Sequence, residues 1–292
     1  MIQKKLLTQI KILILSDIHQ NYDYISLLQK KQLDNKKNYD YIFILGDNDN
    51  IQISQDQTKE EQEKLSSESD LNIEKLFLKI REIYPQEQIY HIPGNHDSYN
   101  LFNGKNYDKI SNCVNIHKQK VEIAKNLYLL GFGGSIPGYK YNEKTQKYTD
   151  QVWVGFPFIN DDNYGEELTD FIYNNIENKD ETNSDQQIIL LTHIGPQFSK
   201  TTEFLEEEQP IQSGSNALGF LLNDLPNKIN NTSILANIHG HTHDSQGQEK
   251  YKFGRVINAG PIQYGQFTEI DLRINEFNKK WEISNVSFNQ LP

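Results

Sequence analysis

Residues 89–97 read IYHIPGNHD, an apolar-leaning run that leads through Pro93 into a polar turn. This pattern predicts a strand that ends in a tight loop. In α/β proteins ligands gather at such strand ends, because the sheet is rigid while the loop can vary in shape. The loop offers an amide on Asn95, an imidazole on His96 and a carboxylate on Asp97. A polar surface turn would look the same in isolation, so the other strand ends decide the interpretation.

Two earlier apolar runs end in the same manner. Residues 10–15 predict a buried strand that is followed by Asp17 and His19, two positions apart and so on the same side of an extended chain. Residues 41–45 predict a second strand, followed closely by Asp47. A helical pattern separates the runs, which indicates a βαβ unit with both carboxylates at one edge of the sheet. A helix cap and an Asp-containing turn are the structural alternatives for the two aspartates.

Two later runs repeat the arrangement. Residues 188–191 predict a buried strand that precedes His193, and residues 234–238 predict another that precedes His241 and His243. Five of the eight histidines of the chain therefore follow predicted strands.

Side chains of this kind, gathered at one sheet edge, form a mixed set of metal ligands. Imidazole nitrogens with carboxylate and amide oxygens suit Mn²⁺, Fe, Zn²⁺ or Mg²⁺ and exclude thiolate and iron–sulfur sites. The set is too large for one ion, and two ions that share a carboxylate are the natural division. Such pairs stabilise the attacking and leaving oxygens of a phosphoryl displacement.

The rest of the pattern predicts an α/β (α+β) protein. Helices are expected at residues 71–83, 164–175 and 215–222, and a mobile polar loop is expected at residues 50–70. Further strands, predicted to be mostly antiparallel because the turns between them are short, are expected at residues 113–116, 121–124, 127–132, 256–261, 266–272 and 281–288.

The segment 133–163 lacks clear periodicity but is rich in aromatic residues. It is either a long surface excursion packed by its own rings or a lid that faces the substrate. Loops of this length are uncommon without a role, which favours the lid. The aromatic residues are Tyr139, Tyr141, Tyr148, Trp153, Phe156 and Phe158.

Composition narrows the class of protein. The formal net charge of −11 argues against non-specific nucleic-acid binding, which needs Lys and Arg to neutralise phosphates. The single cysteine, Cys113, excludes an internal disulfide and fits a reducing compartment. Residues 1–15 imitate a signal peptide but lack a cleavage site, and no apolar stretch could span a membrane. We therefore expect a cytoplasmic protein without a membrane partner.

Taken in order, the strand-end motifs resemble those of the calcineurin-like metallophosphoesterase superfamily, over residues 12–272. These motifs are Asp17-Ile18-His19, Gly46-Asp47, Gly94-Asn95-His96-Asp97, Thr192-His193 and Gly240-His241-Thr242-His243. Two further stretches resemble the small stand-alone phosphoesterases more than the protein phosphatases. They are Gly133-Gly134-Ser135 and Asn258-Ala259-Gly260-Pro261.

The resemblance implies a four-layer αββα sandwich, with two mixed β-sheets face to face and helices outside. We expect residues 1–292 to form a single metallophosphoesterase domain, with a motif core at 10–275 and the lid inserted at 133–163.

The resemblance also implies two divalent metal ions. The ligands of the first would be Asp17, His19 and His243, those of the second would be Asn95, His193 and His241, and Asp47 would bridge them. A hydroxide between the metals would attack phosphorus in line, and His96 would donate a proton to the leaving oxygen. Mn²⁺ is the expected ion, with Fe, Zn²⁺ or Mg²⁺ also compatible.

One position departs from the pattern. Relatives such as the protein phosphatases have an aspartate three residues after the bridging carboxylate, and this aspartate orients the catalytic histidine. Here that position is Asn50, while Asp49 comes one residue short. Asp97 is therefore a second catalytic residue that could orient His96, or alternatively a brace for its own loop.

These inferences predict a metal-dependent phosphodiesterase or phosphomonoesterase that acts on a small or mid-sized substrate. The alternative is a catalytically idle member of the fold that serves as a structural or interaction module. Idle members usually lose ligands, and here none is lost. A nuclease is disfavoured by the net charge and the lack of a basic stripe.

Overall fold

The computed structural model describes residues 8–292 apart from 55, 143–144, 146, 177–185, 206–210, 229–231 and 252. For residues 141–142, 147–150 and 226–228 it describes the backbone alone. The side chains of Tyr141 and Tyr148, two of the aromatic residues of the expected lid, lie outside the described part.

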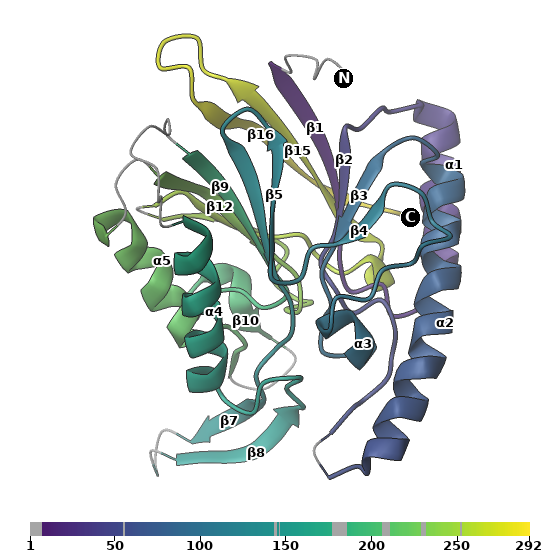
Figure 1. Cartoon of the computed structure of the whole chain (residues 1–292), viewed down its shortest axis with the longest axis vertical. Coiled ribbons are helices and arrows are strands. Elements are labelled where there is room, and N and C mark those ends of the chain that lie inside the picture. The colour runs from purple at the N-terminus through teal and green to yellow at the C-terminus, as the bar shows by residue number, and fades with distance from the viewer. Residues whose placement is uncertain are drawn as a thin grey trace.

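The helices and strands follow one another along the chain as Figure 1 shows. The helices are α1 (Tyr22–Asn35), α2 (Lys59–Ile83), α3 (Tyr99–Phe102), α4 (Asp161–Ile176) and α5 (Asn216–Lys228), with 3₁₀ turns η1 (Lys200–Thr202) and η2 (Ile262–Tyr264). The strands are β1 (Gln9–Leu15), β2 (Tyr41–Ile44), β3 (Gln88–His91), β4 (Cys113–Asn115), β5 (Gln119–Ala124), β6 (Leu127–Phe132), β7 (Gly138–Asn142), β8 (Lys147–Trp153), β9 (Gln186–Thr192), β10 (Glu203–Phe204), β11 (Ile211–Gln212), β12 (Thr232–His239), β13 (Gly247–Lys250), β14 (Arg255–Asn258), β15 (Gln266–Ile274) and β16 (Trp281–Gln290).

Two large mixed sheets form the centre of the molecule. The first sheet has the strand order β16-β15-β1-β2-β3-β4, in which β1 to β4 are parallel and β15 and β16 run antiparallel. The second sheet has the order β13-β14-β12-β9-β6-β5, with antiparallel strands at both edges.

Strand alternation builds the layers. In β1, Ile10, Ile12 and Ile14 pack into the apolar cluster between the sheets, while Leu13 and Leu15 pack outward against α1 and α2. The second sheet alternates likewise, and its outer face is covered by α4 and α5. The helices therefore lie outside both sheets (Figure 1), and the expected four-layer αββα sandwich is confirmed.

The strands near the middle and end of the chain are less uniformly antiparallel than expected. Strand β4 pairs with β3 in parallel in the first sheet, whereas β5 and β6 form an antiparallel pair in the second. Strand β14 pairs in parallel with β12 and antiparallel with β13. A short connection predicts that two consecutive strands pair with each other. Here, however, the chain passes from one sheet to the other between β4 and β5.

The expected mobile loop at residues 50–70 is partly wrong, because α2 already begins at Lys59. A capping box starts this helix: the Thr58 side chain accepts a hydrogen bond from the Glu61 backbone amide, and the Glu61 carboxylate accepts one from the Thr58 amide. The polar residues that follow belong to this helix rather than to a loop, and Ser66, Ser69 and Asp70 among them are buried.

The aromatic segment 133–163 contains a β-hairpin. The hairpin was not predicted, because this segment shows no clear periodicity in the sequence. Strands β7 and β8 pair antiparallel with shifts in register, and these shifts blur the alternation in the sequence. Trp153 at the end of β8 donates a hydrogen bond from Nε1 to the Ile136 carbonyl at 3.0 Å. Its indole ring lies over Gly138, where an added Cβ would come within 2.0 Å of the ring.

Among the helices of the described residues, none has the length and apolar character needed to cross a bilayer.

Candidate metal centre

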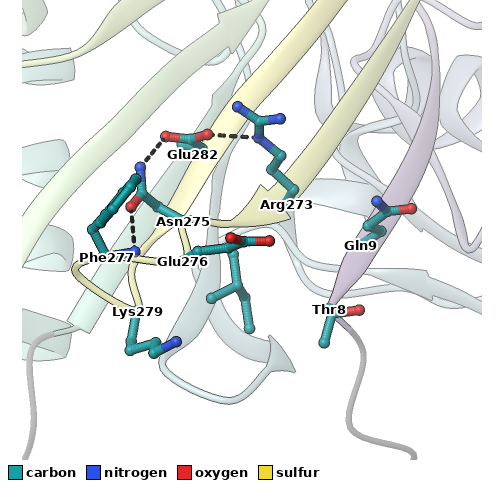
Figure 2. Close-up of a pocket in the computed structure, with 9 residues that line it drawn as sticks. Thr8, Gln9, Arg273, Asn275, Glu276, Phe277, Lys279 and Glu282 are labelled. Carbon is teal, nitrogen blue, oxygen red and sulfur yellow. Dashed lines mark hydrogen bonds and ion pairs between the residues drawn. The ribbon is translucent and has the colours of Figure 1, made fainter.

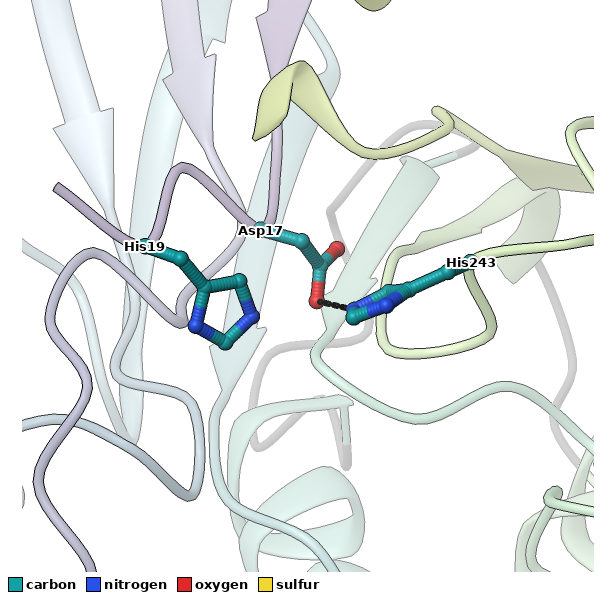
Figure 3. A group of neighbouring side chains, drawn as sticks. All are labelled: Asp17, His19 and His243. Atoms are coloured by element: carbon teal, nitrogen blue, oxygen red, sulfur yellow. Dashed lines mark hydrogen bonds and ion pairs between the residues drawn. The ribbon is translucent and has the colours of Figure 1, made fainter. Parts of the chain in front are cut away.

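The first ligand group consists of Asp17, His19 and His243. Asp17 and His19 follow β1 and His243 follows β12, yet one ligand atom from each lies within 4.8 Å of the others. In Figure 3, His19 and His243 stand on either side of the Asp17 carboxylate. The Nε2 atom of His243 is 3.3 Å from Asp17 Oδ1. The ligands predicted for the first ion thus meet at one point.

The second group brings together Asp47, His193 and His241, also within 4.8 Å of one another. Asn95 completes it, because its Oδ1 lies 3.1 Å from His193 Nε2. These residues follow β2, β9, β12 and β3, so the second set is also gathered from both sheets.

Asp47 lies between the two groups. Its Oδ2 atom is 3.2 Å from Nε2 of His193 in the second group and 3.8 Å from Nε2 of His19 in the first. Its Oδ1 atom accepts a hydrogen bond from the His96 backbone amide at 2.8 Å. Asp47 therefore contacts an imidazole of each group with the same carboxylate oxygen.

The ligand loops hold an uncommon backbone conformation. Asp17, His19, Asp47 and His241 have φ values of 50°, 48°, 51° and 63°, in the left-handed region that side chains other than glycine rarely adopt. The surrounding loops stabilise it, since the amide of His19 donates to the Asp47 carbonyl at 2.9 Å. Backbone strain of this kind concentrates at functional sites, where the structure around it fixes the geometry.

Two glycines let the ligand loops touch. A Cβ on Gly94 would lie 2.2 Å from Asp47 Oδ1, and one on Gly46 would lie 2.3 Å from the Gly94 nitrogen. Any larger residue would push the loops apart and move Asp47 from its place between the two ligand groups.

Contacts behind the ligand imidazoles orient them. His193 Nδ1 donates a hydrogen bond to the Leu45 carbonyl at 2.8 Å, which leaves Nε2 free to face Asp47. The side-chain amide of Gln263 is hydrogen-bonded to Nδ1 of His243 at 2.9 Å. The Leu45 contact is typical of metal-binding histidines, because it fixes the His193 ring and raises its basicity, whereas the Gln263 contact holds the His243 ring in place.

The donor set fits divalent cations. His19 Nε2 is buried and has no hydrogen-bond partner, although it faces the Asp47 carboxylate. A buried nitrogen with a free lone pair costs free energy unless it has a partner, and a cation between the two ligand groups would be that partner. Four imidazoles, two carboxylates and one amide oxygen match ions that accept nitrogen and oxygen ligands.

Comparison with known proteins agrees with this geometry. A family model described as calcineurin-like phosphoesterase matches residues 10–245. The chain belongs to this family. Family and ligand groups together make it a metal-dependent phosphoesterase in the general sense.

Relatives of this calcineurin-like phosphoesterase are distant. An uncharacterized protein of Acanthamoeba polyphaga mimivirus is 28% identical over 214 residues, which are 65% of this chain and 72% of that protein. The Thermus thermophilus protein TT1561 superposes with a TM-score of 0.52 at 13% identity, covering 98% of this chain and 100% of that one. GAP50, the anchor in the inner membrane complex of Plasmodium, gives 0.50 at 10% identity, with 98% and 90% covered. The two structures share the fold with this chain.

The charges within the site of this phosphoesterase favour a cation. Burial opposes ionisation of Asp17 and Asp47, but the adjacent histidines outweigh burial and lower the pKa of both carboxyls. Burial likewise opposes protonation of His193, yet the two carboxylates raise its pKa to about 9. Burial lowers the pKa of His241 to about 3, so this ring is neutral and its nitrogen can ligate.

The predicted proton donor, His96, lies beside the candidate ligands, and its imidazole is held by a backbone carbonyl that belongs to neither ligand group. Its Nδ1 is hydrogen-bonded to the Ile51 carbonyl at 2.9 Å, and its ring centroid is 5.4 Å from that of His19. His96 also lines the cavity above the ligands. Asn50 stands where relatives such as the protein phosphatases have the orienting aspartate. Its side chain contacts His19 instead of His96, with Oδ1 2.8 Å from His19 Nδ1.

Asp97 is buried beneath the same loop. Its carboxylate accepts hydrogen bonds from the backbone amides of Asn48 at 2.7 Å, Gly94 at 2.8 Å and Asp49 at 3.1 Å. Burial and the Asp47 charge raise the pKa of Asp97 to about 7, and these backbone donors oppose the shift. The contacts join the loop after β2 to the loop after β3, whereas the contact to the His96 imidazole comes from Ile51.

The cavity above the ligands has a volume of about 120 Å³. Its floor is polar, and its wall consists of Val152 and Trp153 from β8, Phe204 from β10, and Ser213. A larger hollow of about 650 Å³ lies at the opposite end, between the start of β1 and the β15–β16 turn (Figure 2). There the Glu282 carboxylate is already bound by Arg273 at 2.6 Å and Asn275 at 2.8 Å, so we place the chemistry in the smaller cavity.

Several contributors to the site were not predicted. The carbonyls of Leu45 and Ile51 have no sequence signal, because any residue supplies a carbonyl. Gln263 follows the motif at 258–261 by two residues, and this proximity could have pointed to it. Phe204 comes from a two-residue strand with no recognisable pattern.

Proposed function

We propose that this protein hydrolyses small or mid-sized phosphate esters with two divalent metal ions. The ligands of the first ion are Asp17, His19 and His243, those of the second are Asn95, His193 and His241, and Asp47 is shared. The position of Asp47 Oδ2, 3.2 Å from His193 Nε2 and 3.8 Å from His19 Nε2, supports this most directly. When bound, such ions supply a nucleophile near neutral pH and offset the charge that develops on the phosphoryl oxygens.

The protein's own residues supply proton transfer and positioning. His96 faces the cavity with Nδ1 bound to a carbonyl, so its Nε2 is the nitrogen available to protonate the leaving oxygen. A carbonyl stabilises the imidazolium less than a carboxylate does, which makes His96 a moderate acid catalyst. Asp97 acts as a positioning residue that keeps the Asn95 and His96 loop against the Asp47 loop.

We take Mn²⁺ as the first choice of ion, and Fe, Zn²⁺ or Mg²⁺ suit the same ligands. We also treat residues 1–292 as one functional domain, with the hairpin within 133–163 as part of its substrate-facing surface.

An idle scaffold is the alternative, and one structural neighbour, GAP50, is described as an anchor. The seven expected ligands are all present here, and one buried ligand nitrogen lacks a hydrogen-bond partner. A scaffold would not need either feature, so hydrolysis is the better proposal.

The test combines metal content with activity. Protein saturated with Mn²⁺ should contain two ions per chain and hydrolyse at least one member of a panel of phosphomonoesters, phosphodiesters and cyclic nucleotides. Asp47→Asn should lower both metal content and activity, since one carboxylate serves both ions. Asp40→Asn, an exposed aspartate before β2, is the matched control and should change neither. One ion or fewer per chain at saturation contradicts the shared site, and a fully loaded but inactive protein supports the scaffold.

A further inference from the structure

Asn50 holds His19 with both ends of its side-chain amide. The Nδ2 atom donates a hydrogen bond to the His19 carbonyl at 2.9 Å, and the Oδ1 atom lies 2.8 Å from Nδ1 of the His19 ring. The two residues are 31 positions apart and come from the loops after β2 and β1. One amide therefore contacts the backbone and the imidazole of the same residue, which fixes the ring relative to its own loop.

The orientation of the amide decides which nitrogen of the neutral His19 ring carries the proton. A carbonyl only accepts hydrogen bonds, so the Asn50 atom that faces it is the NH₂ group, and the amide oxygen faces the ring. That oxygen is an acceptor, so Nδ1 is the protonated nitrogen. The lone pair is then on Nε2, the buried nitrogen that has no hydrogen-bond partner and lies 3.8 Å from Asp47 Oδ2. A nitrogen in this state can bind a cation.

The contact to the carbonyl matters because His19 has an uncommon backbone conformation. His19 and Gln20 are consecutive residues in the left-handed region, with φ values of 48° and 55°. Their amides donate to the carbonyls of Asp47 and Asn48 at 2.9 and 3.0 Å. The Asn50 side chain adds a third contact between the same two loops through the His19 carbonyl. The loop after β2 thus holds both the ring and the backbone of this candidate ligand.

Asp49 keeps Asn50 in place. One of its carboxylate oxygens accepts hydrogen bonds from the Asn50 backbone amide at 2.8 Å and from the Gln20 side chain. The other oxygen accepts one from the Asn72 side chain on α2 at 3.3 Å. Asp49 itself is buried. Asn50 is therefore anchored at its backbone, although its own side chain lies near the surface.

The contacts of His96 are separate from those of Asn50. The Nδ1 atom of His96 is bound to the Ile51 carbonyl at 2.9 Å, and His96 lines the cavity. The rings of His96 and His19 are close, with centroids 5.4 Å apart, yet the amide of Asn50 is directed to His19. The position that orients the catalytic histidine in the protein phosphatases therefore supports a candidate metal ligand in this chain.

We propose that Asn50 is a positioning residue for the first metal ion. It sets the tautomer and the place of His19 so that Nε2 meets the ion, and it takes no part in proton donation by His96. The inference rests on the proposed function, because it takes Asp17, His19 and His243 as the ligands of that ion. Contacts of this kind behind a metal-binding histidine typically contribute ~10–100-fold in metal affinity.

Three variants test the effect on metal affinity in a two-step titration against a competing chelator. Asn50→Leu removes both contacts and should weaken the first ion by roughly 10–100-fold, while the second stays nearly unchanged. Asn50→Asp keeps an acceptor for Nδ1 but loses the donor to the carbonyl, so it should recover most of that affinity. Gln52→Leu is the matched control, because Gln52 is exposed on the same loop and Gln57 binds its carbonyl. The step that is lost in His19→Ala identifies the first ion.

A comparison of two esters separates a role at His19 from a role at His96. With both sites saturated, Asn50→Asp should hydrolyse a nitrophenol ester and an ester with a poor leaving group in the wild-type ratio. A selective gain for the poor leaving group would mean that position 50 acts on His96, which overturns the inference. Wild-type affinity for the first ion in Asn50→Leu overturns it as well, and either result leaves the proposed function intact.

The tautomer can be read without turnover and without metal. In metal-free protein labelled with ¹⁵N-histidine, the neutral His19 ring should carry its proton on Nδ1, and NMR of His19→Gln identifies its signals by their absence. In Asn50→Leu the Nδ1 proton should exchange faster with solvent. A wild-type ring protonated on Nε2 contradicts the inference alone. A wild-type protein that binds no ion and hydrolyses no ester overturns the proposed function, and the inference with it.

Discussion

His96 lines the cavity with its Nδ1 bound to the Ile51 carbonyl, and we propose that it donates a proton and is not a metal ligand. Replacing it with alanine should leave both metal ions bound, while turnover of an ester with a poor leaving group falls by ~10²–10⁴-fold. We expect a value toward the lower end, since a carbonyl rather than a carboxylate holds Nδ1. An ester of a nitrophenol needs little protonation and should lose far less.

Rates for the two esters, measured beside metal content, give the check for His96→Ala. Equal losses for both esters would mean that the variant damages the metal centre, and loss of an ion would place His96 among the ligands.

Gln263 is a residue whose effect should be confined to one ion. Its amide contacts the His243 imidazole, so Gln263→Leu should weaken the first site by ~10–100-fold and leave the second nearly unchanged. A two-step metal titration with a competing chelator measures this. Gln290→Leu is the matched control, because Gln290 contacts the same 3₁₀ turn through the Tyr264 carbonyl and no imidazole. Equal weakening of both sites would contradict the assignment.

Among single residues, the sequence predicts the side chains that the structure brings together as candidate ligands, and it misses the groups that orient them. Asp17 and Asp47 stand out because a carboxylate after a buried strand recurs at regular places. The carbonyls of Leu45 and Ile51 could not be predicted, since their position depends on how two loops pack. Asn50 was identified as a departure, but its contact with His19 depends on a loop geometry that no spacing encodes.

The β7–β8 hairpin is the element that carries part of the cavity wall. Replacing residues 139–148 with a short glycine–serine linker should change the relative rates for different esters, because β7 holds β8 and its Trp153 in place. Metal content should stay at the wild-type value, since no assigned ligand lies in the hairpin. Shortening the β15–β16 turn at residues 276–279 serves as the control. Unchanged rate ratios would favour a packed excursion over a lid.

Elements buried on both faces were the predictable ones. Residues 10–15, 41–45 and 188–191 are continuous apolar runs, and each forms a central parallel strand. The amphipathic and edge elements were harder, because α2 begins with a polar first turn and β7–β8 has irregular register. Pairing between β12 and β14 could not be predicted, since it depends on which sheet the chain re-enters.

The stability of the whole molecule should depend steeply on pH below neutrality. Burial lowers the pKa of His91 and His117 to about 3 and that of His239 to about 4, against about 6.5 in the unfolded chain. The unfolded state therefore binds protons that the folded state rejects, so stability is full above about pH 6.5 and falls as the pH drops toward these values.

His91 gives the clearest test of this acid sensitivity. Both of its ring nitrogens are buried without a hydrogen-bond partner, between Phe77 and Tyr107. Between pH 7.5 and pH 5, the free energy of unfolding of the wild type should fall by about 2 kcal/mol more than that of His91→Leu, as measured by urea unfolding. Tyr90→Phe, its neighbour on the other face of β3, should follow the wild-type curve. Parallel curves for His91→Leu and wild type would contradict the neutral state of His91.

Both ligand groups draw on the two sheets at once. Asp17 and His19 follow a strand of the first sheet and His243 follows one of the second, while Asp47 follows a strand of the first sheet and His193 and His241 follow strands of the second. A bound ion is therefore a reversible cross-link between the halves of the sandwich, formed only after they have docked. It follows that the rate at which an excess of a strong chelator strips the ions measures how often the two sheet edges part. If the ions are released slowly in buffer and faster in sub-denaturing urea, the rate of metal release would report how often the interface between the sheets opens transiently.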